Sequence, residues 1–526
     1  MKTRLRPLWL LLCLGALVLS CKETAKNTEK AQGANEQETA YYTEAFRPQF
    51  HFSPEEKWMN DPNGLVYHKG IYHLFYQYYP EDIVWGPMHW GHATSTDLVH
   101  WQHKPIALYP DEHGLIFSGS AVVDVNNTSG FGSLENPPLV AIFTYHDMKG
   151  EQEGKNDYQT QGIAYSLDNG ETWTKHVGNP VIKNNGYKDF RDPKVFWNEN
   201  TNKWTMLLVA GDHMQVWLSD NLKVWEQVSE FGRDKGAHGG VWECPDMFKL
   251  KVDGTAMEKW VLLISINPGA PNGGSGTQYF IGDFDGTTFT TEQDGAKWFD
   301  LGRDNYAGVT YNDAPNGERI FIGWMSNWDY ARDTPTEKWR SAMTLPRTLR
   351  LENMNGRYEL FNYPISQVDM LMDGSTTGRS MEMAAGDTTQ LALPSGNQTE
   401  IKFTVTRPNM QLILRNEKGE ALNLSLDADG EMARLDRSQS GLVDFSERFV
   451  NGVQEMPMPH LPEGPIEVRM FLDNSSLEVF VNKGQYVMTN QIFPTQDYTV
   501  LEMVPKGTAP LAITEMTVRP VARIWD

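Results

Sequence analysis

Cysteine is scarce in this chain of 526 residues, which contains only three. Cys13 and Cys21 lie near the amino terminus, inside or directly after an apolar stretch, so Cys244 is the one cysteine in the bulk of the sequence. A single cysteine cannot form an intrachain disulfide, and it cannot build a cysteine-based zinc site. The sequence therefore excludes a disulfide framework and a zinc module of that type.

A long apolar run and an excess of positive charge are lacking as well. The apolar run LWLLLCLGALVL, residues 8–19, is too short to span a bilayer comfortably. The formal net charge is −22, which repels phosphate backbones and anionic lipid surfaces. We therefore expect no nucleic-acid partner and favour a neutral substrate.

The length exceeds what one hydrophobic core usually spans, which predicts at least two domains.

The amino terminus is typical of a sorting signal, because basic residues at positions 2, 4 and 6 precede the apolar run. The stretch VLSC that ends the run resembles a bacterial lipoprotein box, which implies cleavage before Cys21 and lipidation of that cysteine. An ordinary cleaved signal is the alternative. We expect a signal peptide over 1–20 and a polar tether over 21–45. The protein would then be held at the cell envelope by its lipid alone, on a side of the membrane that the sequence leaves open.

Beyond the tether, the sequence predicts an all-β protein. Short runs rich in β-branched and aromatic residues alternate with Gly, Asn and Asp turns, and no long stretch keeps a helical period. A weak repeat places an aromatic residue after an Asp or Asn turn, at intervals of about 50 to 70 residues. Such periods are typical of a four-stranded sheet that is repeated radially. The repeated aromatic residues are Trp101, Trp173, Trp225 and Phe289.

Four repeats and a closing sheet through RIFIGWMSNW predict a five-bladed β-propeller over residues 46–350. We expect a connector over 351–372. Alternating strands such as SLEVFVN, with one buried and one solvated face, then predict an antiparallel β-sandwich over 373–526.

Three acidic residues stand out by their neighbours: Asp61 in WMNDPNG, Asp192 in DFRDPKVFW and Glu243 in VWECPDMF. They are separated by roughly two blades and one blade of the predicted propeller. Because the innermost strands of successive blades line one central funnel, we expect the three carboxyl groups to meet there. Glycoside cleavage needs two carboxyl groups, one ionised and one protonated, on either side of the scissile bond.

The neighbours of these acids suggest which of them is protonated. Glu243 is flanked by tryptophan, cysteine and proline, and such apolar surroundings raise the pKa of a carboxyl group. Asp61 lies beside Asn60 and Asn63, whose amides are donors able to keep a carboxylate ionised. The hypothesis is that Glu243 acts as the acid and Asp61 as the attacking group.

Taken in order, the blocks HFSPEEKWMNDPNGL, FSGSAV, FRDPKVF and WECPDMF resemble the signature blocks of glycoside hydrolase family 32, the fructan hydrolases and invertases. Later, DRSQSG and SSLEVFVNKG are similar to the C-terminal sandwich of that family. The resemblance covers nearly the whole mature chain, and several matches in the right order are a specific signal.

This resemblance implies a five-bladed propeller plus sandwich and a retaining double displacement on a β-fructofuranosyl unit. Asp61 would be the nucleophile that forms a fructosyl-enzyme at C2, and Glu243 would be the acid and then the base. Asp192 would bind fructose hydroxyls and stabilise the oxocarbenium-like transition state. Arg191 could steady these acids through charge-assisted hydrogen bonds.

By the same motif matching, five residues would line the fructose subsite. Two are tryptophans that can stack on a sugar ring or wall the pocket, and three are polar residues that can hydrogen-bond hydroxyl groups. Each also has a structural alternative, as a core plug, a turn residue or a strand partner. The five are Asn60, Gln77, Trp85, Ser118 and Trp324.

A cluster of four histidines lies in MHWGHATSTDLVHWQH, at positions 89, 92, 100 and 103. On a strand His89 and His92 would point to opposite faces, and no HExxH or CxxC pattern accompanies them. We therefore interpret the cluster as structural and expect no metal and no cofactor.

Several alternatives stay open at this stage. A fructosyltransferase would use the same intermediate but pass it to a sugar. SLDNGETW also looks like the Asp-box turn of sialidases, and an arabinan-cleaving propeller is a related possibility. A tethered glycan-binding protein would keep the fold without turnover, although binding alone needs no acid–base pair.

Exo or endo action, the β-2,1, β-2,6 or sucrose linkage, the role of the sandwich and the oligomeric state are not decided by the sequence. WGPMHWGHA looks more like the exo-acting members, which favours release of fructose from chain ends.

Overall fold

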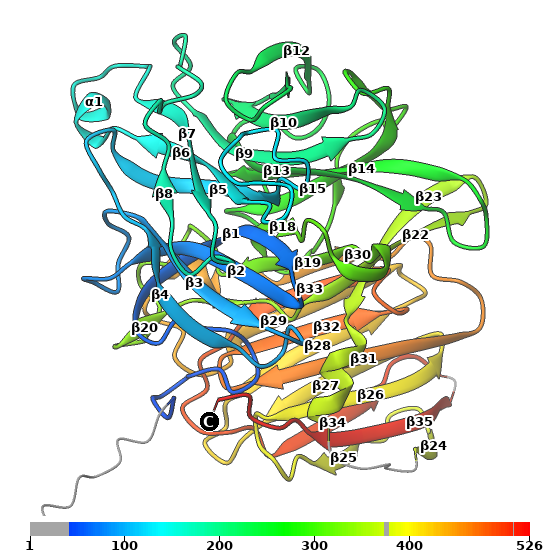
Figure 1. Ribbon diagram of the computed structural model, residues 1–526. Helices are drawn as coiled ribbons and strands as arrows, with labels where there is room; N and C mark the ends of the chain where they lie inside the picture. Colours follow the sequence, from blue (N-terminus) through cyan, green and yellow to red (C-terminus); the bar gives the residue numbers. More distant parts are fainter. Residues whose placement is uncertain (1–41, 373–377, 509, 526) are drawn as a thin grey trace, which may run out of the picture. The chain divides into compact units, whose positions relative to one another are not determined.

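The computed structural model describes residues 42–372, 378–508 and 510–525, and the fold of these residues is built from β-strands (Figure 1). Two short α-helices, α1 (Met148–Gln152) and α2 (Glu447–Val450), and two 3-10 turns, η1 (Pro315–Gly317) and η2 (Ser366–Leu371), complete the regular elements. The predicted signal peptide, the lipidation site Cys21 and the tether up to residue 41 lie outside the described residues. In the described part, no helix is both long and apolar enough to cross a membrane.

The first group of strands forms five sheets in sequence order. The first sheet contains β20 (Trp339–Arg340), β1 (Lys57–His68), β2 (Ile71–Tyr79), β3 (His89–Ser95) and β4 (Gln102–Leu108). The second contains β5 (Leu115–Val123), β6 (Leu139–His146), β7 (Gln159–Ser166) and β8 (Thr174–Lys175), and the third β9 (Phe190–Asn198), β10 (Lys203–Ala210), β11 (Met214–Ser219) and β12 (Glu226–Phe231).

The fourth sheet contains β13 (Val241–Lys251), β14 (Glu258–Asn267), β15 (Gly276–Phe284) and β16 (Phe289–Thr290), with β17 (Lys297–Trp298) paired to β15. The fifth contains β18 (Tyr306–Thr310), β19 (Ile320–Met325), β22 (Arg347–Met354) and β23 (Arg357–Pro364), with β21 (Ala342–Met343) paired to β19.

The first strands of these five sheets form a closed ring. Strand β1 contacts β5, β5 contacts β9, β9 contacts β13, β13 contacts β18, and β18 contacts β1. The late strand β20 pairs in parallel with β1, matching Lys57 with Trp339 and Trp58 with Arg340. A segment from the end of the ring is thereby hydrogen-bonded to its beginning. Radial repetition of this kind is the arrangement of β-propellers.

The aromatic repeat found in the sequence marks the outer edge of the sheets. Trp101, Trp173 and Trp225 stand directly before β4, β8 and β12, and Phe289 is the first residue of β16. The indole N–H of Trp173 donates to the carbonyl of Gly170, and that of Trp225 donates to the carbonyl of Leu222. Trp173 and Trp225 therefore close the turns that lead into β8 and β12, which explains why the repeat pairs a turn with an aromatic residue there.

The fifth sheet extends further along the chain than the sequence indicated. Strands β22 and β23 pair along their whole length, from Arg347 with Pro364 to Met354 with Arg357, and β22 pairs with β19. The propeller boundary predicted at residue 350 therefore falls inside β22, and the expected connector 351–372 is mostly strand. The segment that links the two groups of sheets is η2 and its flanks.

The second group of strands forms two six-stranded antiparallel sheets that enclose an apolar core. In strand order, one sheet contains β24 (Arg379–Met383), β35 (Leu511–Pro520), β26 (Thr399–Thr406), β31 (Pro465–Asp473), β32 (Ser476–Val481) and β33 (Tyr486–Gln491). The other contains β25 (Thr389–Ala392), β34 (Val500–Pro505), β27 (Asn409–Arg415), β28 (Ala421–Asp427), β29 (Met432–Gln439) and β30 (Gln454–Pro457).

The folded chain begins before residue 46. The ring of Tyr42 stacks on Trp525 with a centroid distance of 4.1 Å, and Tyr42 is buried. Residues 42–45, which the sequence analysis assigned to the tether, therefore belong to the packed structure. The segment that follows the last strand of the sandwich and the first residues of the described chain thus share one core.

A buried charge network surrounds His51, which lies just before β1. Its Nδ1 lies 2.7 Å from Oδ2 of Asp473 on β31, and its Nε2 lies 3.4 Å from Oε1 of Glu478 on β32. Burial lowers the pKa of His51, but hydrogen bonds and charges from both carboxylates outweigh burial and raise this pKa to about 9. His51 is therefore charged at neutral pH and holds the start of β1 against the sandwich strands.

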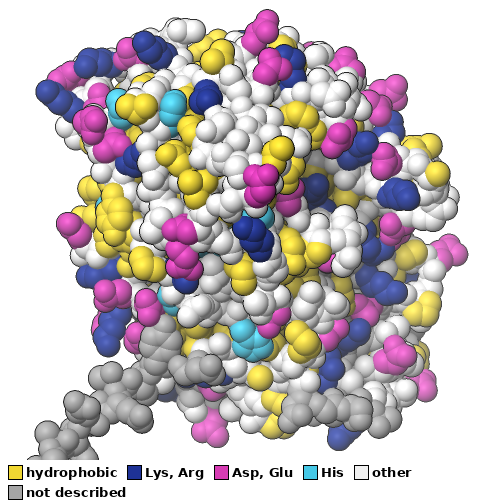
Figure 2. Space-filling view, in the orientation of Figure 1, with side chains coloured by type: hydrophobic (Ala, Val, Ile, Leu, Met, Phe, Trp, Pro, Cys, Tyr) yellow, Lys and Arg dark blue, Asp and Glu magenta, His cyan; other side chains and the backbone are white. Residues whose placement is uncertain are grey.

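Acidic and basic side chains alternate over the face shown in Figure 2. The acidic residues of this face thus lie among basic residues and are not concentrated in one acidic patch. Such a mixed surface creates no strong local field, which suits a neutral ligand.

Candidate active site

The three acidic residues singled out in the sequence lie in one pocket at the centre of the ring. Asp61 lies on β1, Asp192 on β9 and Glu243 on β13, each of which is the first strand of its sheet. Ser118 reaches the same pocket from β5, and the cavity has a volume of about 410 Å³. The predicted meeting of residues that are far apart in sequence is therefore confirmed.

A local break in strand pairing presents each site residue to the pocket. The register shifts between Met59 and Pro62 on β1, between Ile116 and Gly119 on β5, and between Glu243 and Asp246 on β13. The pairing of β9 with β10 shifts at Asp192 and Pro193 in the same way. Bulges commonly re-aim side chains next to active sites.

Proline explains why the breaks occur at these positions. A proline directly follows Asp61 and Asp192, and Pro245 follows Glu243 by two residues. Proline has no N–H to donate, so the ladder is interrupted where the acid must point inward. Asp192 has a φ of 64° and Cys244 has a φ of 45°, values that non-glycine residues rarely adopt. Backbone strain of this kind is frequent at functional sites.

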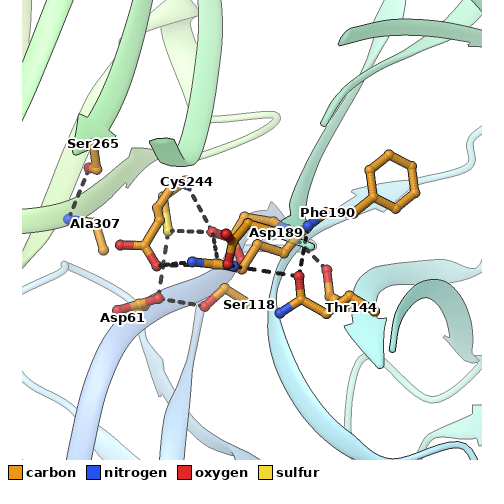
Figure 3. Close-up of polar contacts among 12 residues, drawn as sticks. Asp61, Ser118, Thr144, Asp189, Phe190, Cys244, Ser265 and Ala307 are labelled. Atoms are coloured by element: carbon orange, nitrogen blue, oxygen red, sulfur yellow. Dashed lines mark hydrogen bonds and ion pairs between the residues drawn. The ribbon is translucent and has the colours of Figure 1, made fainter. Parts of the chain in front are cut away.

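Asp61 is held by three donors, of which Ser118 and Cys244 are labelled in Figure 3. Its Oδ1 accepts from Nδ2 of Asn60 at 3.0 Å, and its Oδ2 accepts from Oγ of Ser118 at 2.6 Å and lies 3.6 Å from Sγ of Cys244. Burial and the charge of Glu243 raise the pKa of Asp61, while the three donors lower it, and the net direction is upward. The carboxylate is thus fixed in place but is easier to protonate than an exposed aspartate.

Asp192 is bound through the backbone of the neighbouring sheet. Its Oδ2 accepts from the backbone N–H of Cys244 at 3.0 Å and lies 3.6 Å from Sγ of the same residue. Burial raises the pKa of Asp192, Arg191 lowers it, and the charges of Glu243 and Asp61 raise it further, to about 7. Asp61 and Asp192, which share this small pocket, therefore do not both ionise easily.

Glu243 is bound by a cation and a phenol. Its Oε1 accepts from Nη2 of Arg191 at 3.0 Å and from Nε at 3.3 Å, while its Oε2 accepts from the hydroxyl of Tyr306. Burial lowers the pKa of Arg191, but Glu243, Asp192 and Asp189 raise it well above its usual range, so this residue is a permanent cation. Burial and Glu243 also raise the pKa of Tyr306 well above its usual range, which keeps its hydroxyl protonated as a donor.

These contacts correct two expectations about the surroundings of the acids. Trp242, which was expected to make the setting of Glu243 apolar, is fully buried and packs in the core between the third and fourth sheets. Asn63, which was expected to donate to Asp61, accepts instead from Nε2 of Gln77 at 2.7 Å. Trp242 adjoins Glu243 on a strand and so points to the opposite face. The expected donation from Asn60 to Asp61, in contrast, is present.

Four of the five predicted subsite residues line the pocket, and so does Arg191. Trp324 does not. It is fully buried, its ring packs against Trp58 and Tyr306, and it lies beneath Trp328 at a centroid distance of 4.9 Å. The indole of this segment that lines the pocket is that of Trp328, four residues further on. The lining residues that were predicted are Asn60, Gln77, Trp85 and Ser118.

Several residues of the site were not predicted from the sequence. Trp328 and Arg332 form part of the wall, and the guanidinium of Arg332 lies 5.9 Å from the ring of Trp85 and 5.8 Å from that of Trp328. The second tryptophan of GWMSNWDY is Trp328, and the first aspartate of DFRDP is Asp189, so both residues were visible in motifs of the sequence. Tyr306 carried no signal. Other lining residues that were not named are Phe117, His146, Glu151, Tyr158, Gln159 and Asn267.

Three histidines of the predicted cluster take part in ring packing, and the fourth, His100, contacts the carboxylate of Asp97 at 2.8 Å. His92 stacks on Phe75 at a centroid distance of 4.2 Å, and His103 stacks on Trp525 at 5.6 Å. Within residues 42–372, 378–508 and 510–525, no group of three or more His, Cys, Asp or Glu residues is arranged to hold a metal ion.

Comparison with known proteins adds an independent observation. Residues 51–364 match the family model described as glycosyl hydrolases family 32 N-terminal domain, and residues 367–520 match the glycosyl hydrolases family 32 C terminal model. The chain is 46% identical over 505 residues to a levanase of Bacillus subtilis, covering 94% of this chain and 73% of that protein. It is 42% identical to the extracellular exo-inulinase of Aspergillus niger, covering 89% and 93%.

Solved structures agree with these matches. The crystal structure of exo-inulinase from Aspergillus awamori superposes with a TM-score of 0.85 at 38% identity, covering 92% of this chain and all of that one. The β-fructofuranosidase from Schwanniomyces occidentalis complexed with fructosyl-erythritol gives a TM-score of 0.81 at 30% identity, covering 92% and 99%.

Proposed function

The chain belongs to glycosyl hydrolase family 32 and is a glycoside hydrolase of the β-fructofuranosidase type, and from this premise we propose that it is an exported exo-fructanase with Asp61 and Glu243 as its catalytic pair. The single observation that carries the proposal is the meeting of Asp61, Asp192 and Glu243 in one small pocket whose polar groups suit a neutral sugar. The reaction class is hydrolysis with retention through a covalent intermediate.

In the first step, a carboxylate oxygen of Asp61 attacks C2 of the terminal fructosyl unit. The bond from C2 to the leaving oxygen breaks, and protonated Glu243 transfers its proton to that oxygen. In the second step, Glu243 removes a proton from water, the water oxygen bonds to C2, and the bond from C2 to Asp61 breaks. Fructose leaves, Asp61 is again a carboxylate, and Glu243 is again protonated.

The neighbours of the pair support these roles. Asn60 and Ser118 fix both oxygens of Asp61, which orients the carboxylate for attack on one face of the sugar ring. Arg191 and Tyr306 fix Glu243 in turn. The charge of Glu243 raises the pKa of both Asp61 and Asp192, so the pocket holds a proton more readily than isolated aspartates do.

Asp192 is assigned to substrate binding and transition-state stabilisation. Its carboxyl group is buried, is held by the backbone of Cys244 and faces the same pocket as the catalytic pair. A carboxylate in that position stabilises the positive charge that develops on the sugar ring, since electrostatic terms are strong where water is excluded.

Exo action is favoured by the pocket form of the site. Trp85, Trp328 and Arg332 stand together at its wall, and the cavity of about 410 Å³ is of the size that encloses a small ligand. The similarity to exo-inulinases and to a levanase supports inulin and levan as the substrates of this chain. The similarity to an invertase of Schizosaccharomyces pombe, at 36% identity, keeps sucrose among the candidates.

The proposal also includes a five-bladed propeller followed by a sandwich, and a location at the cell envelope. The five sheets whose first strands close into a ring support five blades, followed by a sandwich. The lipoprotein-like stretch that ends at Cys21 supports anchoring at the cell envelope through a lipid.

The test is a time course of products from the purified protein with levan, inulin and sucrose in separate reactions. Free fructose from the first time point, without early oligosaccharides, is the expected result, and the relative rates identify the linkage. Early oligosaccharides would replace exo with endo action. Transfer products at high sucrose would instead indicate a fructosyltransferase.

A second measurement separates an enzyme from a glycan-binding protein. Glu243→Gln should abolish turnover of fructans while preserving retardation of the protein in gels that contain levan or inulin. If neither the wild-type protein nor the variant releases product from any of the three substrates, the hydrolase assignment fails.

A further inference from the structure

A second cavity lies in the ring of sheets, apart from the catalytic pocket. It has a volume of about 580 Å³, and none of its lining residues lines the catalytic pocket. Its walls come from the far ends of the same inner strands, since Phe196 follows Asp192 by four residues on β9 and Met247 follows Glu243 by four on β13. At about 3.3 Å per residue, this places the second cavity on the order of 13 Å further along the strands. We call it the distal groove.

Aromatic side chains form the base of the distal groove. Phe196, Trp197 and Trp204 come from the β9–β10 hairpin, and Trp260 is contributed by β14. Trp197 packs edge-on against Trp204 at a centroid distance of 5.2 Å, and Phe196 packs against Trp260 at 5.8 Å. Trp197 and Trp260 are half-buried, so part of each ring is open to the groove.

Polar groups without a protein partner surround these rings. No acceptor in the described protein takes the indole N–H of Trp197 or of Trp260, whereas that of Trp204 donates to Oγ1 of Thr128 at 2.8 Å. The side-chain amides of Asn126, Asn200 and Asn202 line the groove and make no hydrogen bond within the described protein. Aromatic faces beside free amide and indole donors are suited to the apolar faces and hydroxyl groups of sugars.

The charges in the distal groove favour a neutral ligand. Its four charged lining residues comprise two acids, Glu199 and Asp313, and two bases, Lys249 and Arg319. Lys249 pairs with Glu258 at 3.0 Å, and Nη1 of Arg319 donates to the carbonyl of Tyr311 at 3.1 Å. Because the signs balance and both cations have partners, a phosphate or carboxylate gains little here.

The platform is also rigid before any ligand arrives. Oδ1 of Asn198 accepts the backbone N–H of Asn200 at 3.0 Å, and Nδ2 of Asn198 donates to the carbonyl of Gly286 at 3.2 Å. The tip of the β9–β10 hairpin is thereby fixed to the fourth sheet. A pre-ordered surface loses little conformational entropy when it binds.

From these observations we infer that the distal groove is a second sugar-binding site, which holds a segment of a neutral β-fructan while chain ends are hydrolysed in the catalytic pocket. The identity of the ligand rests on the proposed function. The catalytic pocket encloses a chain end, so it gives the enzyme little hold on the rest of a polymer. A second site raises the local concentration of chain ends, and it matters for levan or inulin but not for sucrose.

The test compares Trp197→Ala, Trp260→Ala and the double variant with wild type in two assays. In gels that contain levan or inulin, measured in a Glu243→Gln background to prevent hydrolysis, the apparent Kd of the double variant should rise about fivefold or more. In the active background, the rate on polymer at low concentration should fall about threefold or more, while the rate on sucrose stays within about twofold of wild type.

Two controls keep the outcome interpretable. Tyr109→Ala removes a half-exposed aromatic residue that lies outside both cavities and should change neither assay. Asn126→Ala with Asn200→Ala removes only free surface amides, and it should weaken retardation even if the tryptophan variants fail to fold.

Unchanged retardation and an unchanged polymer-to-sucrose rate ratio in the folded variants would overturn the second site. This failure differs from failure of the proposed function, in which wild type releases no fructose from any substrate. Loss of retardation in the groove variants of an inactive protein would still support the groove as a glycan site.

Discussion

The hydroxyl of Ser118 lies 2.6 Å from Oδ2 of Asp61, so that two strands of neighbouring sheets are joined by a hydrogen bond to the proposed nucleophile. This bond lowers the pKa of Asp61 against the effects of burial and of Glu243, which raise it. The bond therefore helps to keep the carboxylate of Asp61 ionised. Removal of one atom, the hydroxyl oxygen of Ser118, tests this role.

Ser118→Ala should raise the pKa of Asp61 further, because a donor to the ionised form is lost. We expect kcat/KM on sucrose or inulin to fall about 10- to 100-fold. In the pH profile of kcat/KM, the acidic limb should move to higher pH. The matched control is Ser120→Ala on the same strand, since the hydroxyl of Ser120 bonds only to the backbone of β9. That control should lower Tm and leave the acidic limb in place.

Glu243→Gln should move the acidic limb in the opposite direction. The charge of Glu243 raises the pKa of both Asp61 and Asp192, so removal of the charge lowers both values. We expect turnover of fructans to fall by roughly 10³-fold or more, with smaller losses on a substrate whose leaving group needs no proton. An acidic limb that stays fixed in the residual activity would contradict the coupling between these acids.

Asp192→Asn should abolish most activity yet stabilise the protein at alkaline pH. The pKa of Asp192 is about 7 in the folded chain and 3.8 for an ordinary aspartate, so the folded state holds the proton more tightly. The group therefore reduces stability as pH rises from about 4 to 7, and the full penalty is present above 7. We expect Tm of the variant to exceed that of wild type by about 2 °C or more at pH 8 and to show no such gain at pH 4.

His51→Gln should destabilise the protein in a pH-dependent way. Since the folded pKa of about 9 is above the ordinary value of 6.5, the contribution of His51 is fully present below pH 6.5 and is lost as pH rises through 9. Thermal unfolding should show a large drop in Tm at pH 6 and a smaller drop at pH 9.5. His100→Gln, at a ring that is 55% exposed, is the control and should show neither effect.

Trp324 and Trp328 should respond in opposite ways to replacement by alanine. Trp324 is a fully buried core residue, and its loss should reduce the free energy of unfolding by about 3–5 kcal/mol in urea titrations. Trp328 lines the pocket, and its loss should raise KM for fructans at least about fivefold with a smaller change in stability. Equal effects of both variants on KM would return Trp324 to the subsite.

Much of the fold and of the site could be predicted from local features of the sequence. The acids of the site follow from motifs that combine a carboxylate with a proline one or two residues later, because proline breaks the ladder and lets the side chain turn inward. The repeat of a turn and an aromatic residue predicted the sheet-by-sheet organisation, and Trp173 and Trp225 each close their own turn. Such features depend on residues that are near one another in the chain.

Other features were decided only when distant strands met. The surroundings of Glu243 are set by Arg191 and Tyr306 from two other sheets, not by its neighbours in sequence. The choice of Trp328 over Trp324 as the pocket wall depends on how the chain packs after β19, which the motif does not encode. The end of the fifth sheet at Pro364 is likewise set by pairing with strands that come earlier.

The sequence alone thus determined the all-β class, the family and the three carboxylates, because these are carried by spacing and by residue type. Tertiary structure alone determined the pKa of Asp192, the donation from Ser118 and Cys244 to Asp61 and the existence of the distal groove. The physical reason is that burial and electrostatic interaction depend on distances through space, and the closed ring brings together residues that the chain keeps far apart.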